Sequence, residues 1–187
     1  MNISPIFNSF IANEKLSLDN DSIKKYCYKV SAESDKLKTT YFSLSEPELQ
    51  EMFSEIQKHI DSVHSRLGFS NNFRQIIYNS WVNINTTPYT NQPHVHANIP
   101  KILLSGIYYP KAEDDAPLIH FISPISAHPY VIDPKTISEN NEFTSSRWRV
   151  KPSTGDLILF PCWLQHYVEP TLHNEDRISI AFNTVIV

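Results

Sequence analysis

Glycine, cysteine and long apolar runs are scarce in this sequence, and each shortage excludes a class of protein. The 187 residues include three glycines, too few for the glycine-rich loops that cradle phosphate groups. The two cysteines, Cys27 and Cys162, lie far apart, which predicts neither a disulfide framework nor a thiolate metal site. This cysteine usage is typical of a reducing compartment, so we expect a cytoplasmic protein.

Membrane and nucleic-acid signals are also missing. No apolar stretch approaches the length of a membrane span, and the N-terminus lacks the basic and apolar regions of a signal peptide. The net charge is -4, and lysine and arginine form no cluster. We therefore expect neither a membrane partner nor a dedicated nucleic-acid-binding surface. The oligomeric state stays open, and a homodimer is compatible with the sequence.

What the sequence does contain is enough apolar material for one globular domain over residues 1–187. Hydrophobic residues make up 41% and charged residues 19% of the chain. We expect residues 1–75 to supply an N-terminal strand and bracing helices, and residues 76–187 to form a catalytic core. Within the first part, Ile6–Ile11 reads as a strand and Leu18–Ser34 as a first helix.

A second helix has the clearer pattern. Ser45 and Glu48 have the spacing of a capping box, and Gly68 has the position of a left-handed C-terminal cap. On this helix we expect His59 and His64 to be solvated. The apolar residues at helical spacing are Leu49, Met52, Phe53, Ile56, Ile60, Val63 and Leu67.

From residue 76 onward the pattern changes to short strands separated by turn-forming residues. The expected strands are Ile77–Asn85, Pro93–His96, Ile102–Tyr109, Leu118–Ile122, Trp148–Lys151, Leu157–Phe160, His166–Glu169 and Arg177–Ile186. No helical segment separates them, which disfavours a parallel sheet. The sequence predicts a mainly β protein with bracing helices (α+β), built as a jelly roll or double-stranded β-helix, with a cavity between its sheets.

One long segment, residues 123–147, interrupts the strands. It is polar and contains Pro124, Pro129 and Pro134. Segments of this length are often lids or binding segments, and a plain surface insertion is an equal alternative. His128 within it is expected to lie at the surface or to contact substrate.

Two histidines, His94 and His96, are two residues apart in an extended segment. Side chains at this spacing point to the same face of a strand, so both imidazoles can reach one metal ion. A pair of surface histidines is the alternative. A third candidate, His166, follows the apolar strand Leu157–Phe160 and a rigid turn, and a packed core histidine is its alternative.

The last strand carries an unusual polar face. Ile178, Ile180 and Phe182 alternate with the set Arg177, Ser179, Ala181 and Asn183. Arginine and serine on one face suit a carboxylate, because the guanidinium offers paired charge-assisted hydrogen bonds. An edge strand whose polar face meets solvent is the alternative.

Taken together, these residues resemble the 2-oxoglutarate and Fe(II)-dependent oxygenases over about residues 76–187. The matching positions are His94, His96, His166, Arg177 and Ser179. The segments Ser80–Asn85, Leu104–Tyr109 and Phe160–His166 are similar to a bacterial and phage subgroup of that family.

The resemblance implies an Fe(II) oxygenase that uses 2-oxoglutarate and O₂ to hydroxylate a substrate, releasing succinate and CO₂. It implies that His94, His96 and His166 ligate iron, and that Arg177 and Ser179 hold the far carboxylate of 2-oxoglutarate. Asn83, or Asn85 in its place, is expected to hydrogen-bond the cofactor.

His96 departs from the family pattern, because the family carries a carboxylate there. Either three histidines hold the iron, which is the arrangement we favour, or another group completes the site. Asp156 is a candidate, although its Gly-Asp sequence favours a turn. Two other functions stay open: a three-histidine cupin-type dioxygenase without 2-oxoglutarate, and a non-catalytic jelly-roll binding or structural protein.

Overall fold

A computed structural model of the chain describes residues 1–6, 8–32, 39–41, 44–85, 91–97, 102–125, 132–170 and 176–187. Two helices, α1 (Asn20–Ala32) and α2 (Gln50–Arg66), accompany two antiparallel sheets. In sheet order, the larger sheet contains β1 (Ala12–Lys15), β8 (Asp156–Pro161), β5 (Ile102–Lys111), β10 (Arg177–Ile186), β3 (Gln75–Asn85) and β2 (Thr39–Tyr41). The smaller sheet contains β4 (Asn91–His94), β9 (His166–Val168), β6 (Ile119–Ile122) and β7 (Arg147–Val150).

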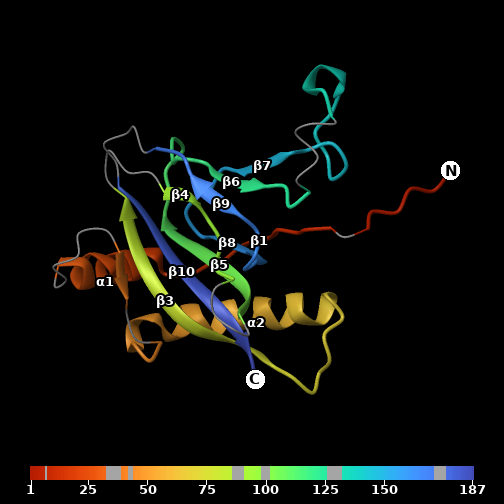
Figure 1. Cartoon of the computed structure of the whole chain (residues 1–187). Coiled ribbons are helices and arrows are strands. Elements are labelled where there is room, and N and C mark those ends of the chain that lie inside the picture. The colour runs from red at the N-terminus through yellow and green to blue at the C-terminus, as the bar shows by residue number, and fades with distance from the viewer. Residues whose placement is uncertain are drawn as a thin grey trace.

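The chain passes back and forth between the two sheets. From β3 to β6 successive strands alternate sheets, as they do again from β7 to β10. This topology is that of a double-stranded β-helix, and the predicted fold class is confirmed. Figure 1 shows the smaller sheet on one side of the larger sheet and both helices on the other.

The helices cover the outer face of the larger sheet because both sides supply apolar residues. Ile23 and Cys27 of α1, and Ile56 and Ile60 of α2, are buried in one core cluster with β10 residues such as Ile180. Burying an aliphatic side chain of this size contributes about 1.5–3 kcal/mol. In the described part of the chain, neither helix is long and apolar enough to cross a membrane.

All eight strands expected after residue 76 are present, with shifted ends in most cases. The range of β10 matches the prediction, whereas β4 begins and ends two residues before the predicted Pro93–His96. The strand expected at Ile6–Ile11 is wrong. The first strand, β1, starts at Ala12, because Ala12–Lys15 is the segment that pairs with the edge of β8.

The capping box at Ser45 and Glu48 is also wrong, and Pro47 provides the reason. A 3₁₀ turn (Pro47–Leu49) precedes α2, and neither Glu46 nor Leu49 makes a side-chain cap. Proline fits the first position of a helical turn, where its missing N–H costs nothing.

The end of α2 follows the prediction at Gly68 but not at His64. Gly68 has a φ of 77°, and its N–H donates to Ser65 O at 3.1 Å while that of Phe69 donates to His64 O at 3.3 Å. These bonds make a Schellman motif. His64 is buried rather than solvated, because its ring stacks on Phe69 and its Nε2 lies 3.3 Å from Ser70 O. Leu67 is exposed instead of joining the core.

Candidate metal and cofactor site

Three imidazoles meet between the two sheets. His94 ends β4, His166 begins β9, and the two are cross-strand partners. His96 lies two residues beyond the end of β4. One nitrogen from each ring can be chosen so that all three atoms lie within 4.8 Å of one another. Metal–imidazole bonds are about 2.0–2.1 Å long in zinc sites, so small side-chain shifts bring all three to one ion.

His96 reaches this cluster although it does not belong to the strand. Its backbone N–H donates to Cys162 O at 2.8 Å, which joins the segment after β4 to the turn before β9. The His96 ring then stacks on His166, with 5.2 Å between centroids and 18° between planes. The Trp81 ring centroid lies 5.7 Å from that of His96. The loop after β4 therefore brings His96 next to His94, although the sequence predicted that one continuous strand would do so.

In His94 and His166, a hydrogen bond from one ring nitrogen determines which nitrogen is free to bind a metal. His94 Nδ1 lies 2.7 Å from Gln92 O, and His166 Nδ1 lies 2.9 Å from Leu164 O. A carbonyl oxygen only accepts, so each Nδ1 must carry the proton and donate it. The lone pair of each Nε2 is left for a metal, which is how backbone carbonyls orient metal-binding histidines.

Burial keeps two of these rings neutral. Loss of solvent, followed by the nearby His94, lowers the pKa of His96 from 6.5 to about 4. Burial likewise lowers the pKa of His166 to about 3, although its bond to Leu164 O acts in the opposite direction. A neutral imidazole is the form that binds a metal, so both rings are ready ligands at neutral pH.

No carboxylate belongs to this cluster within the part of the chain that the structure describes. Asp156 is the first residue of β8, directly after the turn at Thr154 and Gly155: it accepts from Ser153 N at 2.7 Å and pairs with Lys15 Nζ at 3.1 Å. Three neutral imidazoles leave the full double charge on a divalent ion, which favours an anionic co-ligand.

A cavity of about 190 Å³ adjoins the histidines, and β10 provides one side of it. Arg177, Ser179 and Ala181 line the cavity, while Ile178 and Ile180 pack in the helix-covered core. Since β10 lies between β5 and β3, the alternative of a solvent-facing edge strand is wrong. Asn183 does not line the cavity, because its side chain bonds to its cross-strand partners: it accepts from Ser105 Oγ at 2.7 Å and donates to Asn79 Oδ1 at 3.1 Å.

Arg177 is 5% exposed, and its surroundings suit an anion. Its Nη2 donates to Asn85 Oδ1 at 2.7 Å, and its guanidinium carbon lies 5.6 Å from the centre of the Tyr109 ring. Within the described residues, the buried Asn85 Nδ2 and Tyr109 Oη atoms have no hydrogen-bond partner. Burial raises the pKa of Tyr109, so its hydroxyl stays protonated and can donate. A carboxylate beside Arg177 would satisfy both orphaned donors.

Asn83 and Ser179 are cross-strand partners, and both line the cavity. Sequence reasoning named them but missed Tyr109. Its signal was present in the alternation of β5, because Ser105, Ile107 and Tyr109 all line the cavity. His128 lies outside the described residues.

Close packing of β5 against β10 shapes the cavity wall. A Cβ on Gly106 would lie 2.2 Å from Phe182 Cζ and 2.8 Å from Leu159 Cδ2, so only glycine fits. Ile119, Phe160 and Val168 supply apolar surface elsewhere in the cavity.

Comparison with known proteins agrees with this geometry. Residues 79–183 match a family model described as "Putative 2OG-Fe(II) oxygenase". No curated protein sequence matches the chain.

Solved structures show the same fold at low sequence identity. A Pseudomonas putida prolyl-4-hydroxylase is 11% identical, with a TM-score of 0.63 over 94% of this chain and 91% of that one. The epimerase SnoN, in complex with Fe³⁺, alpha ketoglutarate and nogalamycin RO, is 12% identical, with a TM-score of 0.67 over 95% and 79%. Iron-bound HygX from Streptomyces hygroscopicus is 11% identical, with a TM-score of 0.59 over 95% and 82%.

A double-stranded β-helix with an imidazole cluster beside a buried arginine defines a non-haem metal enzyme that takes an anionic co-substrate. The family match covers more than half of the chain, and the chain belongs to the 2-oxoglutarate and Fe(II)-dependent oxygenases. Membership favours this class over the cupin-type and non-catalytic alternatives.

Proposed function

We propose that His94, His96 and His166 hold the Fe(II) of this oxygenase through three imidazole nitrogens. The convergence of one nitrogen from each of the three rings, all within 4.8 Å of one another, carries the proposal. The hydrogen bonds from Nδ1 of His94 and His166 support it, because they orient the Nε2 lone pairs before the metal arrives.

Arg177 and Ser179 bind the far carboxylate of 2-oxoglutarate in this proposal, with Asn83 as a further hydrogen-bonding partner. The observations in support are the burial of Arg177 and the common cavity that these residues line. Tyr109 and Asn85 add donors that the anion would satisfy. Arginine binds a carboxylate in a fixed two-point geometry, which orients the rest of the co-substrate toward the imidazoles.

The reaction proposed is hydroxylation, in which R–H, O₂ and 2-oxoglutarate give R–OH, succinate and CO₂. Iron and 2-oxoglutarate supply the oxygen-activating chemistry when bound. The residues of the chain supply geometry. The three histidines keep ligands on one side of the ion, Arg177 fixes the co-substrate, and the apolar walls at Ile119 and Val168 keep water out.

We also propose a cytoplasmic location, supported by two buried cysteines, Cys27 and Cys162, that form no disulfide. The substrate, a small molecule or a macromolecule, is not identified, and the net charge of -4 supports the expectation that the chain has no dedicated nucleic-acid-binding surface. Homodimerisation stays a prediction, which sedimentation velocity measures directly.

The role of His96 is the decisive point, since it occupies the usual carboxylate position. X-ray absorption on the Fe(II) forms of the wild type, His96→Ala and His96→Asp counts the imidazole ligands. We expect three in the wild type and two in each variant, with iron retained better by His96→Asp because a carboxylate oxygen replaces the lost nitrogen. An unchanged imidazole count in His96→Ala would show that His96 acts outside the coordination sphere.

A further inference from the structure

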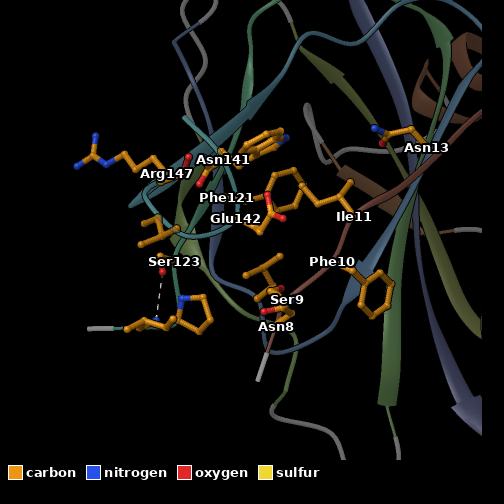
Figure 2. Close-up of a pocket in the computed structure, with 16 residues that line it drawn as sticks. Asn8, Ser9, Phe10, Ile11, Asn13, Phe121, Ser123, Asn141, Glu142 and Arg147 are labelled. Carbon is orange, nitrogen blue, oxygen red and sulfur yellow. Dashed lines mark hydrogen bonds between the residues drawn. The ribbon is translucent and has the colours of Figure 1, made fainter. Parts of the chain in front are cut away.

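A second cavity, of about 380 Å³, shares no lining residue with the cavity that the histidines line. One wall comes from the N-terminal segment, residues 8–13, and the other from β6 and from described parts of the 123–148 region (Figure 2). This volume lies within the range of about 300–1,000 Å³ that is usual for small-molecule pockets. We call it the Phe121 pocket.

The ring of Phe121 connects this pocket to the proposed metal site. Phe121 is the cross-strand partner of His166, and their ring centroids are 6.0 Å apart. Edge-on contact at 5.0 Å joins Phe121 to Phe160, which lines the first cavity. Phe121 is 2% exposed. A molecule in the pocket therefore lies one aromatic ring away from a proposed ligand of the iron.

The lining of the pocket combines apolar and polar side chains, and its apolar part is partly uncovered. Trp148 is the cross-strand partner of Phe121, so both side chains lie on the same face of the smaller sheet. Trp148 is 47% exposed and Ile125 is 44% exposed, although both line a concave site. Phe10 and Ile11 line it from the N-terminal side. A ligand with an apolar body would cover this surface.

The charge that faces the pocket is negative. Figure 2 shows the carboxylate of Glu142 directed into the pocket, whereas the side chain of Arg147 extends away from it. Among the described residues, Glu142 makes no ion pair. A carboxylate next to aromatic faces is the arrangement that recognises an organic cation, through ion pairing and through the π surfaces.

We propose that the Phe121 pocket binds a small organic cation. Its apolar part lies against Phe121 and Trp148, and its ammonium or guanidinium group pairs with Glu142.

The test uses metal-free full-length protein and three probes of matched shape: phenethylamine, hydrocinnamate and phenethyl alcohol. Saturation-transfer NMR and calorimetry measure their affinities. We expect the amine to bind about tenfold more tightly than the acid or the alcohol, as one charge-assisted bond predicts. Glu142→Gln should remove this preference, whereas Arg147→Gln and the control Glu139→Gln should keep it. Trp148→Ala should weaken all three probes.

Equal affinities for the three probes would overturn the inference, as would undiminished amine binding in Glu142→Gln. If hydrocinnamate binds more tightly than the amine, and this preference disappears in Arg147→Gln, the pocket is an anion site instead. The titration requires neither iron nor 2-oxoglutarate, so the two proposals fail separately. Normal iron and 2-oxoglutarate binding without amine preference overturns the cation inference alone. Amine preference without iron binding overturns the proposed function alone.

Discussion

Replacing Arg177 by alanine removes the one buried cation that lines the cofactor cavity in the described structure. The residue is 5% exposed, and its Nη2 donates to Asn85 Oδ1 at 2.7 Å. Truncating one partner of a buried, hydrogen-bonded charge pair costs about 2–5 kcal/mol. At about 1.4 kcal/mol per decade, the affinity for 2-oxoglutarate should fall roughly 30-fold to several thousand-fold.

Two further variants distinguish the effect of the positive charge from that of the two-point hydrogen-bonding geometry, and both from a non-specific effect of removing an arginine. Arg177→Lys keeps the positive charge but loses the two-point fork, so its affinity should lie between those of the wild type and Arg177→Ala. Arg74→Ala removes a surface arginine whose Nη2 lies 3.7 Å from Asp61, and such pairs contribute about 0–1 kcal/mol. It should bind 2-oxoglutarate like the wild type.

The assay is anaerobic calorimetry of 2-oxoglutarate into Fe(II)-loaded protein, with Fe(II) affinity and thermal unfolding measured on the same samples. We expect Fe(II) affinity to stay nearly unchanged in Arg177→Ala, because Arg177 belongs to the cofactor end of the cavity and not to the imidazole cluster. Wild-type affinity for 2-oxoglutarate in a folded Arg177→Ala protein would refute the role of this residue.

Three other predictions follow from the same geometry. His94→Ala and His166→Ala should each abolish tight Fe(II) binding, while the surface control His59→Ala should retain it, as equilibrium dialysis measures. In the metal-free protein, the lowered pKa values of His96 and His166 mean that the unfolded chain takes up protons first as the pH falls. Its free energy of unfolding should therefore fall below pH 6.5, by up to about 1.4 kcal/mol per pH unit for each histidine, until the pH approaches 4 and 3. Gly106→Ala should lower stability by about 1–3 kcal/mol in urea unfolding, since its Cβ would lie 2.2 Å from Phe182 Cζ.

Each of these has a clear contrary result. Undiminished iron affinity in both histidine variants would remove them from the metal site. A free energy of unfolding that stays level from pH 6.5 to 4, or one that keeps its slope in His166→Ala, would contradict the burial of a neutral ring at that position. Unchanged stability of Gly106→Ala would mean that β5 and β10 are less closely packed than described.

Patterns local to the chain were enough to predict most of the strands and the His94 and His96 pair, and the family resemblance added His166 to the imidazole cluster. Successive side chains along β10 point to opposite faces of the sheet. Arg177 and Ser179 therefore line the cavity, while Ile178 and Ile180 pack in the core on the other face. His166 was predicted to share a metal ion with His94, although the two residues come from distant segments. Their cross-strand pairing required only that the expected strands come together in one sheet.

Features that depend on tertiary neighbours could not be predicted. β1 begins at Ala12 because the edge of β8 offers partners there, and the apolar Ile11 lines a pocket instead. His64 is buried by Phe69, a residue beyond the end of its own helix. The Phe121 pocket joins the N-terminal segment to residues that follow it by more than a hundred positions, without any periodic signal.

The most direct test of the account is a crystal grown anaerobically and soaked with Fe(II) and 2-oxoglutarate. An anomalous difference map at the iron edge locates the ion independently of the refined coordinates. We predict a single peak bonded to His94, His96 and His166, with the far carboxylate of 2-oxoglutarate against Arg177. Iron bound at other residues, or 2-oxoglutarate bound away from Arg177, would contradict the central claim that this imidazole cluster and this arginine form one catalytic site.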